Sequence, residues 1–274
     1  MKKILSLLTL LTLVLCLLST AASAESNKNP DPSKGKSVHV QIVLFDGFDL
    51  LDALAPYEVF AAAGMYTGGK VTVELVSVEG KRSVPSGLNG PALDAQDVLD
   101  PNRSGIIVVP GASGKPAGNT ADAIPNILRQ AKDSGLTTMM KQAMNNKDVT
   151  VATVCGGSLL LAMDGLLKDR YAVTNQIGMG ALGALGAIPV DARIVEDGPR
   201  LVTGGGVTSG LDVALYLVER EVGPQIAIVI EKLFEYERRG TVWQANGILP
   251  INFETSQETS KKEQPSAPEK KVEK

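Results

Sequence analysis

The sequence predicts a single α/β domain built on a mostly parallel sheet with helices on both faces. Short apolar and β-branched runs alternate with stretches of helical spacing, which is the pattern of strands joined by crossover helices. The strand-like runs are nearly continuous in apolar residues, as expected for strands buried on both faces. With 274 residues, of which 44% are hydrophobic, the chain can bury a sizeable core without disulfides or metals.

The alternation begins with a strand at residues 38–45, followed by a helix at 51–64 that ends at a glycine. The middle of the domain predicts strands at 71–78, 106–109 and 149–154 and helices at 122–132, 138–146 and 158–167. The last part predicts short strands at 172–174, 193–195 and 201–203, the latter two joined as a hairpin, and helices at 210–221 and 224–238.

Residues 1–24 have the organisation of a secretory signal peptide. Lys2 and Lys3 precede an apolar run over 4–18, and the small residues Ala22-Ser23-Ala24 form a cleavage site. The run is short for a membrane span, which needs about 20 residues, although an uncleaved anchor stays an alternative. We therefore expect an exported protein, secreted, periplasmic or in the cell envelope, after cleavage near Ala24.

Polar segments flank the predicted domain. Residues 25–37 are rich in Pro, Lys and Ser and predict a flexible linker, and residues 251–274 predict a disordered, charged tail, which leaves 38–250 for the domain. The formal net charge is −3, and no stretch gathers Lys and Arg along one face. The charge pattern therefore argues against nucleic acid as a ligand.

Cys155 lies at the turn between a buried strand and a helix, and it is the only cysteine outside the signal peptide. The glycines that follow, Gly156 and Gly157, let the backbone turn sharply. The helix behind them directs its N–H groups and positive end toward the sulfur. Such a setting lowers a cysteine pKa from about 8.5 into the range of about 3.5–7.5 and predicts an activated nucleophile. A packed core cysteine is the alternative.

Four segments carry a resemblance to a known family: LFDGFDLLDALAPYEVF, VVPGASG, VCGGSLLLAMDGLLK and LVTGGGVTSGLDVAL. In this order they resemble the ThiJ/PfpI branch of the class I glutamine amidotransferase-like fold and, within it, the isonitrile hydratase-like group. The resemblance covers about residues 38–247. It implies a flavodoxin-like α/β domain that hydrates or hydrolyses a small carbon–nitrogen substrate through a covalent intermediate on Cys155.

The resemblance also implies an acidic partner for the cysteine. Asp52 stands four residues before Pro56, in the register of the acidic side chain that hydrogen-bonds the cysteine in the family. A carboxyl group beside a thiol and a water is well placed as a general acid or base. Asp52 as a helix N-cap, or Asp46 or Asp49 in its place, are the alternatives.

Backbone N–H groups are the expected oxyanion donors. The turn after the strand at 106–109 resembles family turns that supply such a donor, which implies Gly111 and Ala112 together with Gly156. A plain glycine turn is the alternative.

The residues expected to line the pocket beside the sulfur are Gly157, Thr208 and Ser209. Thr208 and Ser209 belong to the glycine-rich segment 204–210, for which the tight start of a helix is the other interpretation.

Two positions depart from the family pattern. Many relatives have a histidine after the elbow helix, where this chain reads Val173-Thr174-Asn175-Gln176, and its single histidine, His39, begins the first predicted strand. Isonitrile hydratases carry a threonine directly after the cysteine, where this chain has Gly156. Without a Cys–His pair, protease, amidase or glyoxalase chemistry is disfavoured. Asp52 is then the matched group left to move protons.

No cofactor is expected. The sequence has no Cys/His cluster with metal-ligand spacing, and its glycine runs lack a dinucleotide or phosphate-loop context. The methionines at 139, 140 and 144 are expected in core or dimer packing. The expected partner is a small-molecule substrate, a homodimer stays open, and membrane contact is expected only with an uncleaved signal. The functional alternatives are a redox or electrophile sensor acting through Cys155 and a ligand-binding domain without chemistry.

Overall fold

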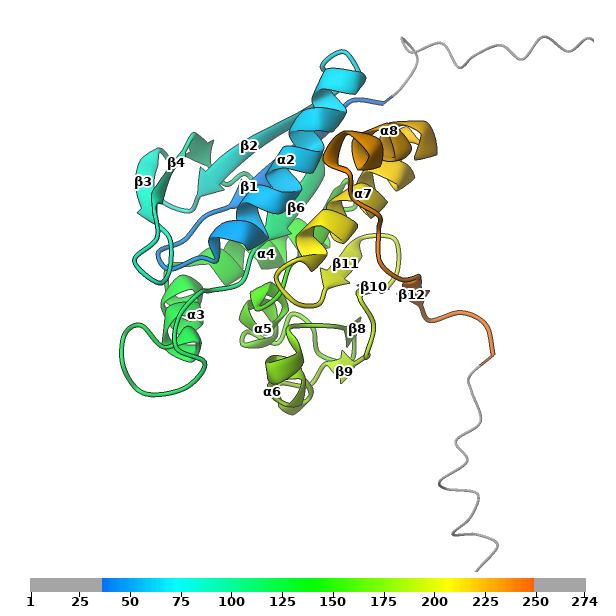
Figure 1. The fold of residues 1–274 in the computed structure, drawn as a ribbon. Coiled ribbons are helices and arrows are strands. Elements are labelled where there is room, and N and C mark those ends of the chain that lie inside the picture. The colour runs from blue at the N-terminus through cyan, green and yellow to red at the C-terminus, as the bar shows by residue number, and fades with distance from the viewer. Residues whose placement is uncertain (1–35, 249–274) are drawn as a thin grey trace, which may run out of the picture.

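The computed structural model describes residues 36–248, so the expected signal peptide and tail, and all but the last two residues of the linker, lie outside the described residues. An eight-stranded sheet forms its centre (Figure 1). Across the sheet the strands follow the order β12 (Val242–Gln244), β10 (Ile194–Glu196), β11 (Leu201–Gly204), β7 (Val149–Thr153), β6 (Gly105–Val109), β1 (Val38–Val43), β2 (Val71–Ser77) and β5 (Asp97–Val98).

Neighbouring strands of this sheet are parallel except β10 and β11, which pair antiparallel as the predicted hairpin. Every residue of β7 is buried, and β6 is buried from its second residue on. Helices cover both faces of these central strands, so polar side chains would have no access to water there. The continuous apolar runs of the sequence follow from this burial, and the predicted fold class is confirmed.

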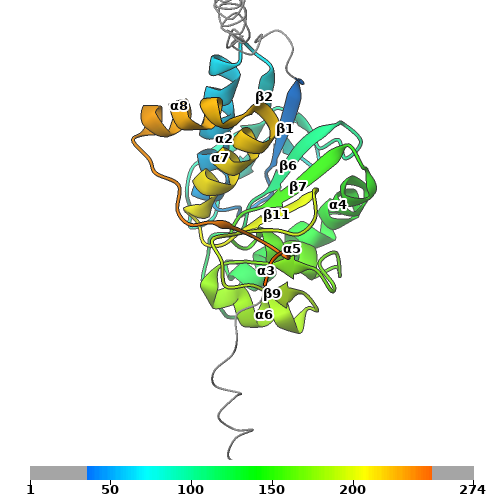
Figure 2. The same cartoon turned by 90° about the vertical axis from the view of Figure 1, so that its right-hand side faces the viewer.

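Two layers of helices enclose the sheet. One layer holds α2 (Leu50–Tyr66), α7 (Ser209–Val222) and α8 (Pro224–Phe234), as Figure 1 shows. The other holds α3 (Ile124–Asp133), α4 (Leu136–Asn145) and α5 (Gly157–Ala162), seen across the sheet in Figure 2. Within residues 36–248, no helix has the length and apolar character needed to cross a bilayer.

Several short elements lie outside the main sheet. They are the hairpin of β3 (Arg82–Pro85) and β4 (Ala92–Ala95), the parallel pair β8 (Tyr171–Ala172) and β9 (Ile188–Pro189), the 3₁₀ helix η2 (Gln176–Gly178) and α6 (Met179–Ala184). Of these, the sequence predicted only β8. Short elements such as β9 have too few residues to display a period of two or of 3.6.

Some helix ends differ from the prediction, and at α2 the reason is a misinterpreted glycine. Gly64 lies inside α2 and does not end it. A Cβ at this position would approach Val71 O to 2.6 Å, so the small size of Gly64 serves helix–strand packing. The helix instead ends before Gly68 and Gly69, which both have positive φ. At the other end of the domain, α8 stops at Phe234 because Glu235 takes a left-handed conformation.

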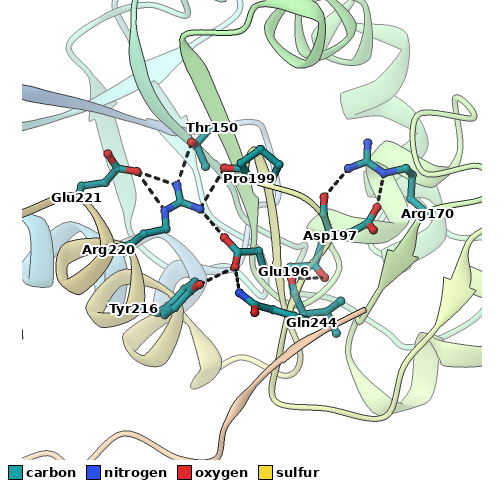
Figure 3. Close-up of polar contacts among 11 residues, drawn as sticks. Thr150, Arg170, Glu196, Asp197, Pro199, Tyr216, Arg220, Glu221 and Gln244 are labelled. Carbon is teal, nitrogen blue, oxygen red and sulfur yellow. Dashed lines mark hydrogen bonds and ion pairs between the residues drawn. The ribbon is translucent and has the colours of Figure 1, made fainter. Parts of the chain in front are cut away.

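A partly buried ion-pair network fixes the antiparallel edge of the sheet to α7 (Figure 3). Glu196 of β10 accepts hydrogen bonds from Arg220 Nη1 at 2.8 Å and Tyr216 Oη at 2.7 Å, and Gln244 of β12 donates to it too. Burial opposes ionisation of Glu196, but these donors together hold its pKa below the usual value. Because Arg220 also donates to Thr150 of β7 at 3.0 Å, one side chain connects α7 with the centre and the edge of the sheet.

Candidate active site

The predicted site residues gather where adjacent parallel strands end. Strands β11, β7, β6 and β1 are neighbours in the sheet and point the same way. Cys155 follows β7, Gly111 follows β6, and Asp52 lies in the first turn of α2 after β1. Segments far apart in the sequence therefore meet at one edge of the sheet, where ligands bind in such folds.

Cys155 sits on a strained turn. Its φ is +54°, in the left-handed region that costs a non-glycine residue roughly 1–2 kcal/mol. The flanking backbone bonds hold it there, with Val154 N donating to Val109 O at 3.0 Å and Cys155 N donating to Gly204 O at 3.2 Å. The nucleophile residue is thereby fastened between β6 and β11, in the elbow geometry expected from the sequence.

Two glycines allow the backbone segments around Cys155 to approach one another closely. A Cβ at Gly157 would lie 2.2 Å from Val109 O, and one at Gly111 would lie 2.5 Å from Gly156 N. Gly156 differs, because a Cβ there would come no nearer than 3.4 Å to any neighbour. The turn therefore needs glycine at 111 and 157 but has room for a side chain at 156.

Asp52 is fully buried, and its two oxygens have different surroundings. Oδ2 accepts a hydrogen bond from Gly111 N at 2.9 Å, whereas Oδ1 has no partner with hydrogen-bond geometry. The N-cap of α2 is Asp49, which accepts from Leu51 N and Asp52 N. The rival Asp46 forms an ion pair with Arg82 on the surface, at 2.7 Å. Among these acidic residues, only Asp52 reaches the cysteine.

Asp52 is held as a neutral acid. Burial raises its pKa to about 8, helped by the charge of Asp49, while the Gly111 N–H and the nearby Cys155 thiol lower it by less. The carboxyl group is therefore protonated at neutral pH. A protonated carboxylic acid can donate a proton, which an ionised one cannot.

The expectation of an acidic cysteine is wrong for this structure. Burial, followed by the charge of Asp52, raises the pKa of Cys155 to about 12. The Asn175 amide and the Gly156 N–H donate toward the sulfur but lower the pKa by less. The cysteine is only 7% exposed, and α5 behind it has six residues, too short for its dipole to outweigh burial. At neutral pH the site therefore pairs a thiol with a carboxylic acid.

The expected oxyanion donors are only partly available. Gly111 N–H is engaged by Asp52 Oδ2, so its prediction as a free donor is wrong. Gly156 N–H donates toward the sulfur, and Ala112 lies against it, because a Cβ at Gly156 would lie 3.6 Å from Ala112 N.

The expected pocket residues from the glycine-rich segment lie differently. Thr208 is exposed, and its Oγ1 accepts a hydrogen bond from Arg193 Nη2 at 2.9 Å rather than one from the site. Ser209 is fully buried as the first residue of α7 and packs against Gly204, where a Cβ would lie 2.6 Å from its Oγ. The helix-start interpretation of this segment therefore describes both residues.

Sequence reasoning missed Asn175. Its Nδ2 donates to Cys155 Sγ at 3.6 Å, and Thr174 Oγ1 donates to Cys155 O at 2.7 Å. The sequence indicated only that no histidine occupies this position. The available signal for Asn175 was its place directly after the predicted strand at 172–174. His39 takes no part, since it bonds to Thr72 and Glu74 on β2.

A cleft of about 410 Å³ adjoins Asn175, lined by Val173, Thr174, Asn175, Gln176, Asp191, Ala192, Arg193, Gly205 and Gly206. A larger hollow of about 1170 Å³ lies along α8 and the segment after it and contains none of the site residues. Among the residues that the structure describes, no group of three or more His, Cys, Asp or Glu side chains is placed to hold a metal ion.

The elbow geometry can be tested with a matched pair of variants. Gly157→Ala should lower the free energy of unfolding by about 1–3 kcal/mol or more, because the new methyl group overlaps Val109 O. Gly156→Ala should change it little, since its methyl group has room. Thermal denaturation of both variants measures the difference, and equal melting temperatures would contradict the proposed packing.

The protonation state of the thiol can be tested by alkylation. The rate of iodoacetamide labelling of Cys155 should keep rising with pH well beyond about 8.5, the ordinary thiol value. Asp52→Asn should move the profile to lower pH, because it removes the neighbouring negative charge and keeps an acceptor for Gly111 N–H. A plateau at or below the ordinary value in the wild type would refute the raised pKa.

The comparisons with known proteins bear on the family and the fold. Isonitrile hydratase from Pseudomonas putida is 33% identical over 202 residues, covering 73% of this chain and 79% of that protein. The HTH-type transcriptional regulator CdhR from Pseudomonas aeruginosa is 25% identical over 194 residues, 70% of this chain but 53% of the regulator. A ThiJ/PfpI family protein from Pseudomonas syringae has a solved structure with a TM-score of 0.64 at 24% identity, covering 80% of this chain and 82% of that one. The model of the DJ-1/PfpI family matches residues 38–220, and the chain belongs to this family.

Proposed function

We propose that this protein is a cysteine-dependent enzyme that hydrates small isonitriles to N-substituted formamides. The observation that carries the proposal is the pairing of Cys155 with a buried carboxyl group whose pKa of about 8 keeps it protonated at neutral pH. The 33% identity to isonitrile hydratase over most of both chains supports the substrate class. The absence of a histidine beside the sulfur leaves Asp52 as the group that moves protons.

The proton of Asp52 has a defined position. Because Oδ2 accepts a hydrogen bond from Gly111 N–H, the acidic proton is carried by Oδ1, which has no other partner. An isonitrile bears its lone pair on the terminal carbon, so this carbon needs a proton and a nucleophile together. Asp52 and Cys155 supply these from neighbouring strand ends.

The first step forms a carbon–sulfur bond. Asp52 gives its proton to the isonitrile carbon while Cys155 Sγ attacks the same carbon, and the thiol proton passes to the Asp52 carboxylate. The product is a thioimidate, R–N=CH–S–Cys155, and Asp52 is again a carboxylic acid. A thiol with a high pKa suits this exchange, because its proton leaves only as the bond forms.

The second step consumes water. Asp52 protonates the thioimidate nitrogen and accepts a proton from the water that attacks the carbon, giving R–NH–CH(OH)–S–Cys155. The carbon–sulfur bond then breaks, and the hydroxyl proton returns to the sulfur through Asp52. The formamide R–NH–CHO leaves, and the thiol is restored.

The sensor alternative gains less support from the site. Oxidation of a cysteine by peroxide proceeds through the thiolate. Burial holds Cys155 in the thiol form at neutral pH, and the charge that Asp52 gains above its own pKa of about 8 opposes ionisation of the thiol further. This environment favours turnover assisted by an acid over spontaneous oxidation.

The reaction can be tested by following N-cyclohexylformamide formed from cyclohexyl isonitrile. Cys155→Ala should abolish turnover, and Asp52→Asn should reduce kcat/KM at least about a hundredfold, the lower end of typical acid–base contributions. The acid form of Asp52 is present below its pKa, so activity should fall as pH rises through about 8.

Circular dichroism of both variants provides the control for folding. A wild-type protein that forms no formamide, while Cys155 is readily oxidised by peroxide, would replace the hydratase proposal with the sensor. A kcat/KM that rises through pH 8 would contradict the role of Asp52 as an acid.

We also propose that the protein is exported, on the signal-peptide pattern of residues 1–24. The intact mass of the protein from the cell envelope or medium should correspond to a chain that begins at Glu25. Recovery of only full-length protein from the cytoplasm would contradict export.

A further inference from the structure

The segment that follows β8 is fastened to the nucleophile at successive residues. Val173 N donates to Thr203 Oγ1 at 3.0 Å, and Ser158 Oγ donates to Val173 O at 2.6 Å. Thr174 Oγ1 donates to the carbonyl of Cys155 at 2.7 Å. These bonds are buried, so the next residue, Asn175, stands at a fixed place beside the sulfur.

The amide of Asn175 has one orientation available. Its Oδ1 accepts a hydrogen bond from Ile177 N at 3.2 Å, as the cap of η2. This bond turns the NH₂ group toward Cys155 Sγ, 3.6 Å from Nδ2. An amide donor does not ionise near neutral pH. It can stabilise negative charge on the sulfur without competing with Asp52 for the proton.

The same side chain also faces open space. Asn175 is one of the residues that line the cleft of about 410 Å³. Gly206 borders it as well, and a Cβ built there would lie 3.7 Å from Asn175 Nδ2 in ordinary contact. Asn175 therefore connects the cleft with the nucleophile.

The lining of the cleft is polar and contains one basic side chain, Arg193, and one exposed acidic side chain, Asp191, which forms no ion pair among the described residues. The guanidinium of Arg193 is neutralised by Asp212, 2.7 Å away, and donates to Thr208 as well. Gln176 and backbone at Gly205 and Gly206 supply much of the remaining surface. Such a surface suits an uncharged substituent that carries hydrogen-bonding groups rather than a bulky hydrocarbon.

We infer that Asn175 is a catalytic residue that donates to the attacking sulfur, and that the cleft beside it receives an uncharged, hydrogen-bonding substituent of the substrate. The inference rests on the proposed isonitrile hydration and assigns it a donor and a substituent site. As the carbon–sulfur bond forms and breaks, the amide stabilises the charge that develops on Sγ, while Asp52 moves the protons.

Substitutions can separate the two roles of the Asn175 amide, as hydrogen-bond donor to the sulfur and as cap of η2. Asn175→Asp keeps an oxygen for Ile177 N–H but replaces the donor with a carboxylate, and Asn175→Ser keeps a capping oxygen without added charge. Both should lower kcat about tenfold or more, as expected for losing a hydrogen bond to a charged group, with smaller changes in KM. Both should also slow iodoacetamide labelling of Cys155 at alkaline pH.

The cleft is tested by Gly206→Ala, which adds a methyl group beside the amide without a strained φ. It should raise KM for 2-isocyanoacetamide more than it lowers kcat. It should also slow labelling by N-phenyl iodoacetamide more than labelling by iodoacetamide itself. Gly180→Ala is the matched control, since Gly180 is exposed on α6 with no atom within 4 Å of the new methyl group.

The outcomes distinguish this inference from the proposed function. If the wild type hydrates no isonitrile while the Asn175 variants still change the labelling of Cys155, the proposed function fails and the donor stands. If the wild type is active and both Asn175 variants match it in kcat and labelling, the donor is refuted. Equal effects of Gly206→Ala and Gly180→Ala on KM and on both labelling rates would refute the cleft.

Discussion

The hydrogen bond from Gly111 N–H to Asp52 Oδ2 is the contact on which the site depends. It joins the end of β6 to the first turn of α2 and gives a fully buried carboxyl group one of the partners it lost on leaving water. Because Gly111 has no side chain, the backbone of the elbow at Gly156 can pack directly against it. The position of the acid follows from this bond, whereas its protonation follows from burial, which outweighs the lowering effect of the Gly111 N–H on its pKa.

The electrostatics of the site differ from those of a thiolate enzyme. Burial raises the pKa of Cys155 and that of Asp52 together, so the pair keeps its protons at neutral pH. Reactivity then lies in the exchange of a proton between two neutral groups and a substrate. Donors that do not ionise near neutral pH, such as the Asn175 amide, are compatible with that exchange.

Much of the fold followed from the sequence because alternating apolar runs and glycines are local signals. The elbow at Cys155 was predicted in this way, whereas Asp52 was implied by its register with the family motif. Two features of the site could not be predicted: the donation from Gly111 to Asp52 and the depth to which Cys155 is buried. Both depend on contacts between segments that lie up to about a hundred residues apart in the sequence, and no local pattern records such contacts. Asn175 was missed because an amide has no motif of its own; its role depends on the turn that brings it to the sulfur.

The spacing around the elbow also bears on how such a protein can change over evolutionary time. Gly111 and Gly157 are closed to substitution, because any side chain there would meet backbone. Gly156 has an ordinary helical φ, and a Cβ there would make only ordinary contacts, at 3.4 Å or more. One position next to the sulfur can thus acquire a new functional group by a single mutation while the backbone keeps its shape.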